Sequence, residues 1–195
     1  MNEQAWATFH KGVSRYSQLE PEAWSALVAL ASPMHLPKES FFVREGEVCT
    51  KVAFVMQGLL RYYYVKDAEE MTGHVAEEGE FITAYPSFLS QSPSRQVVDA
   101  LEDSTVLVLK RDDINGLYDR FHSIERLGRR LAEEILIGSQ SRTALFILDT
   151  AEQRYDWLVS HRPGLIDRIP QYLLASYIGI KPESLSRIRS RRIRN

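Results

Sequence analysis

The sequence predicts an α+β protein in which antiparallel β-structure, a barrel or a sandwich, is followed by a run of helices. Between residues 40 and 109, short β-branched or aromatic runs alternate with glycines and turn residues. The intervals between these runs are too short for helices of about ten residues, which excludes the alternating strands and helices of a βαβ nucleotide-binding fold. Beyond Leu109 the apolar residues recur at helical spacing instead.

The composition is that of a folded protein. The 195 residues are 44% hydrophobic and 26% charged, which suffices for one large domain or for a medium domain and a small one. No apolar run approaches the ~20 residues that cross a bilayer, and the opening MNEQAWATFHKG does not resemble a secretory signal. The single cysteine, Cys49, cannot form an internal disulfide. We therefore expect a soluble protein with no membrane partner, in the reducing cytoplasm.

The charges divide the chain into an acidic body and a basic end. Residues 181–195 contain six basic side chains against Glu183 alone, a balance of +5, whereas the rest of the chain carries −7. Such asymmetry is a hint of binding to a nucleic acid or to another acidic surface. A tail that only improves solubility would have the same composition. The positions of the basic residues along the helix therefore have to distinguish a binding surface from such a tail.

Helices are expected on both sides of the β-structure. Residues 3–31 have a helical pattern, with Pro21 placed in a first turn, and we expect them to form a lid on the strands. A longer helix is expected over residues 123–148, with Ser123 as its N-cap. A further helix, AEQRYDWLVSHRPG, should follow Asp149 and end at Pro163 and the next glycine.

The long helix carries an apolar stripe that needs a partner. Its members are spaced by three, four and four residues: Ile124, Leu127, Leu131 and Ile135. Because the opposite face is charged, this stripe must be buried. It can pack on the β-domain of its own chain, or on the same helix of a second subunit as a dimer interface. The residues alone favour neither arrangement.

Two short helices joined by a glycine turn are expected near the end of the chain. Residues 171–178 form the first, Gly179 makes the turn, and Pro182 begins a second helix that runs to about Arg192. This arrangement is a helix-turn-helix. Apolar residues on both helices can form a shared core: Leu174, Ala175, Ile178, Ile180, Leu185 and Ile188.

The outward face of the second helix has side chains suited to DNA. At about 100° per residue, the face opposite Leu185 consists of Glu183, Arg187, Ser190 and Arg194. An arginine can contact guanine through two hydrogen bonds, and a glutamate can accept one from cytosine. Lys181, Ser184 and Arg191 lie at the flanks, where phosphates would be met. A charged helix face that is simply solvated is the alternative.

The segment RIPQYLLASYIGIKPESLSRIR resembles the helix-turn-helix of the Crp/Fnr family of bacterial transcription regulators, and EGEVCTKVAFVMQGLLRYYYV resembles the first strands of that family's cyclic-nucleotide-binding-type β-roll. The resemblance implies a β-roll sensor domain over residues 1–121, a dimerisation helix over 122–148 and a winged helix-turn-helix over 149–195. It also implies a homodimer on a two-fold symmetric operator, with double-stranded DNA and RNA polymerase as candidate partners. Matched by position, Glu183, Ser184 and Arg187 are the family's base-reading residues.

Two departures from the family concern the DNA-binding part. Lys181 stands where relatives have a threonine or serine, so the side-chain cap of the second helix is absent at a cost of about 1 kcal/mol. The lysine offers a charge suited to a phosphate instead. Few residues follow the second helix, so we expect little material for the family's wing.

A third departure concerns the effector pocket. Cyclic-nucleotide-binding relatives hold the cyclic phosphate with a Gly-Glu pair and a later Arg-Ser/Thr-Ala element. Here the pair is present as Gly79 and Glu80, followed by Phe81, but the later element begins with Ser94 and Arg95. Without the arginine in its place, a buried phosphate would lack its charge partner. We therefore expect no cofactor and no cyclic nucleotide, and an effector that is either unknown or absent.

Other functional classes have less support. One cysteine cannot hold an iron–sulfur cluster, and the histidines are too scattered for a metal or haem site: His10, His35, His74, His122 and His161. A cupin-type enzyme would need histidines clustered on neighbouring strands, so we expect no enzymatic activity. A signalling module whose helix-turn-helix contacts proteins rather than DNA remains the alternative. Salt-dependent binding to mixed-sequence DNA would separate the two.

Overall fold

The computed structural model describes the backbone of residues 3–193 and the side chains of residues 6–192. Two helices, α1 (Glu3–Ser14) and α2 (Pro21–Leu30), precede the strands, as the sequence predicts for residues 3–31. Pro21 is the first residue of α2, where its missing N–H is not needed. No helix within the described residues is both long and apolar enough to cross a membrane.

The β-roll consists of two four-stranded sheets in which every neighbouring pair is antiparallel. The first sheet has the order β1 (Ser32–Leu36), β8 (Ser104–Lys110), β3 (Lys51–Gln57) and β6 (Phe81–Ile82). The second has the order β2 (Phe41–Val43), β7 (Val97–Ala100), β4 (Leu60–Lys66) and β5 (Glu69–Ala76). Between β6 and β7 lies only a short helix, α3 (Tyr85–Ser90). The predicted antiparallel β-roll is thus confirmed.

Helix α1 covers one side of the β-roll core. Phe9 is fully buried, and its ring centroid lies 5.0 Å from that of Phe54, which in turn lies 4.9 Å from that of Phe81. Gly12 lets the helix approach, because a Cβ at this position would overlap the Phe54 ring. The predicted lid therefore contributes aromatic side chains to the core rather than merely shielding it.

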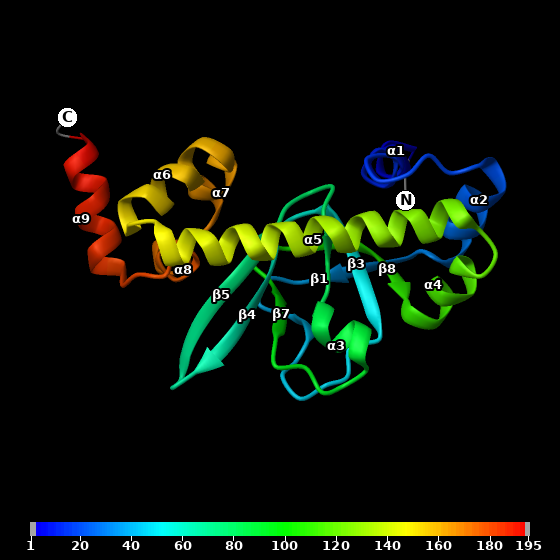
Figure 1. The fold of residues 1–195 in the computed structure, drawn as a ribbon, viewed down its shortest axis with the longest axis horizontal. Coiled ribbons are helices and arrows are strands. Elements are labelled where there is room, and N and C mark those ends of the chain that lie inside the picture. The colour runs from blue at the N-terminus through cyan, green and yellow to red at the C-terminus, as the bar shows by residue number, and fades with distance from the viewer. Residues whose placement is uncertain (1–2, 194–195) are drawn as a thin grey trace.

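The long helix α5 (His122–Leu148) follows the short helix α4 (Arg111–Tyr118) and runs across the molecule (Figure 1). The predicted cap at Ser123 is wrong: the N-cap is Phe121, which offers no side-chain hydrogen bond. The start of α5 is fixed by burial instead. Ile124 and Leu127 are 2% and 7% exposed in the core of the β-roll, and Leu131 packs against that core.

Residues 151–193 contain four helices, α6 (Ala151–His161), α7 (Pro163–Arg168), α8 (Gln171–Ile178) and α9 (Pro182–Ile193). Thr150 and Gln153 form a reciprocal capping box at the start of α6. The predicted stop at Pro163 needs correction, since α6 ends at His161 and Pro163 begins the separate helix α7. Helix α9 ends at the last described residue, so the expectation about the wing lies outside the described residues.

Helices α8 and α9 form the predicted helix-turn-helix. Gly179 has φ +73°, and the N–H of Ile180 donates to the carbonyl of Ala175 at 3.0 Å, so α8 ends in a left-handed glycine turn. A Cβ on Gly179 would overlap the Phe146 ring of α5. The turn therefore requires glycine for both its backbone angle and its packing against α5. Leu174, Ala175 and Leu185 are fully buried in the shared core.

Candidate nucleic-acid interface

The outward face of α9 is free, as predicted from the helical spacing. Leu185 and Ile188 are buried, whereas Glu183, Arg187 and Ser190 on the other side are exposed. In Figure 1, α9 lies at the end of the molecule opposite α2 and α4. No other helix or strand covers this face in the described part of the chain.

The flanking residues form a surface next to the start of α6. Lys181 is exposed, and its carbonyl accepts the first hydrogen bonds of α9, from Ser184 and Leu185. The Arg187 guanidinium donates to the Ser184 hydroxyl at 3.1 Å. An open groove of about 310 Å³ separates α6 from α9 and is lined by Thr150, Ala151, Glu152, Ser184, Arg187, Ile188 and Arg191. The structure thus brings three of the predicted DNA-binding residues to one groove.

The arginines at the end of α9 are paired with α6, which the sequence did not predict. Arg191 Nη1 lies 2.8 Å from Glu152 Oε1, and Arg192 forms an ion pair with Asp156. Both pairs are exposed to solvent, so each contributes little stability. The carboxylate partner of each arginine can therefore be replaced by another anion. Arg194, predicted to face outward, lies outside the described residues. Sequence spacing cannot find such pairs because their partners are far apart along the chain.

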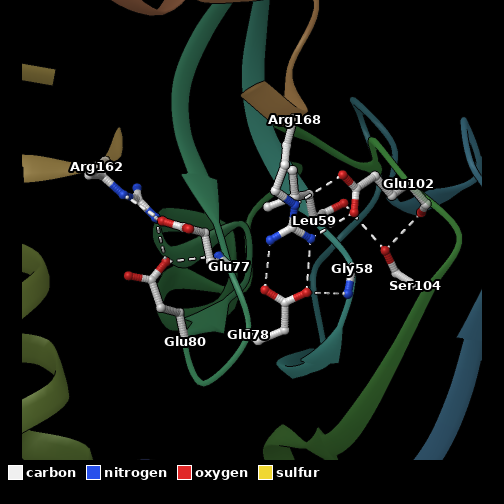
Figure 2. A network of polar contacts seen from close by, with 9 residues as sticks. All are labelled: Gly58, Leu59, Glu77, Glu78, Glu80, Glu102, Ser104, Arg162 and Arg168. Carbon is white, nitrogen blue, oxygen red and sulfur yellow. Dashed lines mark hydrogen bonds and ion pairs between the residues drawn. The ribbon is translucent and has the colours of Figure 1, made fainter. Parts of the chain in front are cut away.

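The predicted effector residues do not converge on one empty site. Phe81 is part of the aromatic core described above, and Ser94 is buried with its hydroxyl donating to the carbonyl of Gln96 at 2.7 Å. Arg95 is exposed and lies in a bend before β7 rather than on a strand. The carboxylate of Glu80 points towards Arg162, which lies between α6 and α7 (Figure 2). Gly79 has φ +88°, which explains a glycine at this turn without any ligand.

Glu80 belongs to a loop that binds two arginines from the C-terminal helices. We call residues Glu77–Glu80, which connect β5 to β6, the acidic loop. Arg162 lies between α6 and α7, and its guanidinium donates to Glu77 Oε1 at 2.9 Å and to Glu80 Oε2 at 3.1 Å. Arg168 at the end of α7 donates to both oxygens of Glu78, at 2.8 and 2.9 Å (Figure 2). No pattern in the sequence indicates these contacts.

These contacts lower the pKa values of two loop carboxyls. The hydrogen bonds from Arg168 lower the pKa of Glu78 to about 2. Burial alone would raise the pKa of Glu80, but the nearby imidazole of His74, with Nε2 3.7 Å from Glu80 Oε2, and the charge of Arg162 outweigh it and lower that pKa to about 2. Both carboxylates are therefore charged over the whole physiological pH range.

The lowered pKa values predict how stability depends on pH. A carboxyl whose pKa falls from 4.5 to about 2 on folding stabilises the folded state above pH 4.5. This contribution should be lost as the pH falls from 4.5 to 2. We expect the difference in unfolding free energy between the wild type and Glu78→Gln/Glu80→Gln, measured with urea, to shrink over that interval. A difference that stays constant down to pH 2 would contradict the lowered pKa values.

The predicted dimer stripe and the exposed apolar surface of α5 are different faces. Ile124 and Leu127 are buried in their own β-roll, Leu131 packs against it, and Ile135 is half-buried. Four large apolar residues in the second half of α5 are instead 60–77% exposed: Leu136, Ile137, Ile147 and Leu148. At about 100° per residue their common face lies roughly opposite Ile124. Continuing the helical pattern to the end of α5 would have revealed this second stripe.

Within the described residues, no group of three or more histidine, cysteine, aspartate or glutamate side chains is arranged to hold a metal ion. The exposed face of α9 with its neighbouring groove is the candidate functional surface on this part of the chain. Its side chains can donate and accept hydrogen bonds and can carry positive charge to a polyanion.

Comparison with known proteins identifies the fold. Residues 33–121 match the model of the cyclic nucleotide-binding domain family. A comparison with curated protein sequences gave no match. Among solved structures, FixK2 from Bradyrhizobium japonicum is similar with a TM-score of 0.69 and 20% sequence identity over 83% of each chain.

Two further structures cover more of the chain. The catabolite activator protein of Thermus thermophilus has a TM-score of 0.59 and 19% identity, covering 92% of this chain and 85% of that one. A protein from Eubacterium rectale described as a transcriptional regulator of the Crp/Fnr family has a TM-score of 0.68 and 14% identity, covering 90% and 85%. Residues 33–121 therefore belong to the cyclic nucleotide-binding domain family, and the chain has the fold of the Crp/Fnr transcription regulators.

Proposed function

We propose that this protein is a sequence-specific DNA-binding transcription regulator that acts as a homodimer on a two-fold symmetric operator. The observation that carries this proposal is the outward face of α9, on which Glu183, Arg187 and Ser190 are free of intramolecular cover. Docked in the major groove, such a face places hydrogen-bonding side chains against base edges. We propose the domain division expected from the sequence, with a β-roll over residues 1–121, a dimerisation helix over 122–148 and the DNA-binding unit over 149–195.

The side chains on and beside α9 divide into two roles. Arg187 reads a guanine, and Glu183 accepts a hydrogen bond from a cytosine. Lys181 and Ser184 lie at the flanks and contact the sugar–phosphate backbone, which fixes the position of the helix; Ser184 takes this role although its match to the family is a base-reading position. Ser190 lies on the outward face with Arg187. Arg191 does the same after exchanging Glu152 for a phosphate, which is supported by the exposure of that ion pair.

The dimer forms through the outward face of α5. Leu136 and Ile147 are eleven residues apart, as are Ile137 and Leu148, so each pair returns to nearly the same side of the helix. A row of exposed aliphatic side chains of this kind is costly in a monomer and is what a two-helix interface requires. Ile124 and Leu127 lie inside the β-roll and are no longer proposed as interface residues.

The β-roll works without a cyclic nucleotide. Glu80, which would hold the ligand in nucleotide-binding relatives, is paired with Arg162, and Arg95 points to solvent. Cyclic AMP and cyclic GMP at millimolar concentration should therefore leave the melting temperature unchanged. A ligand present at 100 times its Kd would add about 2.7 kcal/mol to the unfolding free energy. A clear rise in melting temperature that is lost in Glu80→Ala or Arg95→Ala would contradict this prediction.

Selection of bound sequences from a random pool of double-stranded DNA tests the proposal. We expect enrichment of an inverted repeat whose half-sites are about one helical turn apart, centre to centre. Retention of DNA that depends on salt but has no sequence preference would reduce the function to general DNA binding. Failure to retain any DNA at low salt would leave a protein-interaction module as the function.

A further inference from the structure

The helix-turn-helix unit is docked on the β-roll through a shared apolar core. Leu59 and Val75 of the β-roll are fully buried, and they belong to the same cluster as Leu165 and Ile169 of the C-terminal part. The position of the DNA-binding unit is therefore set by contacts with the domain that carries the acidic loop. Apolar contact alone resists separation but permits sliding, because it has little directional preference.

Arg162 and Arg168, which we call the arginine clamp, fix the orientation of the C-terminal helices on the β-roll. Arg168 forms two bonds to Glu78 and two more to Glu102, the latter through Nε at 3.1 Å and Nη2 at 2.7 Å. Such two-point pairs between planar groups fix orientation as well as distance. Arg162 has only 12% of its side chain exposed and also donates to the carbonyl of Val75 at 2.7 Å. Networks of this kind are the exception to the rule that surface ion pairs contribute little.

The acidic loop is shaped to receive the clamp. Glu78 Oε1 also accepts the N–H of Gly58 at 2.8 Å, and Glu80 Oε2 accepts the N–H of Glu77 at 3.0 Å. The carboxylates are thus held in place by the backbone of the β-roll itself (Figure 2). Three carboxylates within four residues repel one another unless cations lie between them, and the two guanidinium groups supply those cations. This loop is a binding site whose occupants are two arginines of the same chain.

The docked arrangement leaves the DNA-binding face open. The clamp holds the unit by α7 and the end of α6, whereas Arg187 on α9 remains exposed. Helix α8 is attached to the edge strand β5, since Ser176 Oγ accepts the N–H of Thr72 at 2.9 Å and donates to the carbonyl of Glu70 at 2.6 Å. Together with the direct packing of Gly179 on Phe146 of α5, the clamp therefore fixes the place of α9 without blocking it.

We propose that Arg162 and Arg168 are positioning residues for operator recognition, which hold each recognition helix at the spacing that a two-fold operator requires. This inference rests on the proposed function. In a dimer joined through α5, the distance between the two α9 helices depends on how each unit is fixed to its own β-roll. Once one half-site is bound, the second binds at a high effective concentration only if its helix is held in reach and in register. The acidic loop holds the recognition helix in register by binding Arg162 and Arg168 of the same chain, in place of an effector.

The test compares a full operator with a duplex that carries one half-site. The variant Arg162→Gln/Arg168→Gln keeps the polarity of both side chains but removes the charge. We expect it to bind the full operator about 10-fold or more weakly than the wild type, with a change of less than about threefold on the half-site. The variant Arg162→Lys/Arg168→Lys retains charge but not the two-point geometry. Its affinity for the full operator should lie between those of the wild type and the glutamine variant. Affinities are measured by fluorescence anisotropy at one salt concentration.

A matched control removes an ion pair away from the junction. Arg15→Gln breaks the 2.6 Å pair between α1 and Glu134 of α5 and should leave both affinities unchanged. Should the double glutamine variant fail to unfold cooperatively, Glu102→Gln, which removes one arm of the clamp, must still lower the ratio of operator to half-site affinity.

The outcomes separate this inference from the proposed function. A wild type without operator preference would overturn both. A wild type that prefers its operator, with an unchanged ratio in the clamp variants, would overturn the positioning role alone. Equal weakening on both duplexes would also overturn it, because arginines that contact DNA directly act on each half-site. A gain in operator affinity would show that the clamp holds an inactive arrangement, contrary to the proposal.

Discussion

Replacing Ile137 and Ile147 with lysine is expected to give a monomer that binds the operator about 100-fold or more weakly than the wild type. These side chains are 65% and 74% exposed, so two lysines would be tolerated in a folded monomer. In the dimer the same lysines would be buried against an apolar partner and face their own copies, which is unfavourable for both desolvation and charge. Sedimentation velocity measures the change in mass, and anisotropy with operator DNA measures the loss of affinity.

A control for this variant replaces exposed apolar residues elsewhere. Val48 and Leu89 are 43% and 56% exposed on the β-roll, and lysines at these two positions should leave a dimer with unchanged operator affinity. If the Ile137→Lys/Ile147→Lys variant remains a dimer, the interface lies on another surface. If it becomes a monomer but binds operator as well as the wild type, DNA recognition does not depend on dimerisation.

Local patterns in the sequence were sufficient to predict the fold. Short β-branched runs separated by glycines predict antiparallel strands, because both alternation and turn chemistry act over a few residues. The same holds for the helix-turn-helix, where Gly179 and the buried positions Leu185 and Ile188 lie within ten residues of one another. The cap at Ser123 was wrong because tertiary burial of Ile124, rather than a side-chain cap, determines where α5 begins.

Long-range pairing could not be read from the sequence. The partners of the arginine clamp lie 66 to 90 residues away, and that of Arg191 lies 39 residues away. Charged residues have many candidate partners, and only the docking of one unit on another selects among them. The two stripes of α5 show the same limit, since an apolar pattern reveals that a face must be buried but not whether its partner belongs to the same chain.

Two kinds of arginine on α9 should respond differently to removal. Arg187 is exposed on the outward face, and its guanidinium donates to Ser184 within the same helix. Arg187→Ala should cost about 1–3 kcal/mol on the selected operator and relax the preference at one base position in each half-site, with little effect on random DNA. Arg191→Ala should instead weaken binding to all DNA by a similar factor and reduce the salt slope by about one for each phosphate that is no longer neutralised.

Glu152 offers an independent check on these roles. Because its carboxylate lies 2.8 Å from Arg191, it competes with a phosphate for the same guanidinium. Glu152→Gln should therefore strengthen binding to operator and random DNA alike, the opposite of Arg191→Ala, without changing the base preference. Anisotropy titrations of each variant on both duplexes, repeated at several salt concentrations, measure all of these effects. If Arg187→Ala weakens operator and random DNA by the same factor, Arg187 does not read a base, and the outward face of α9 does not lie in the major groove as we propose.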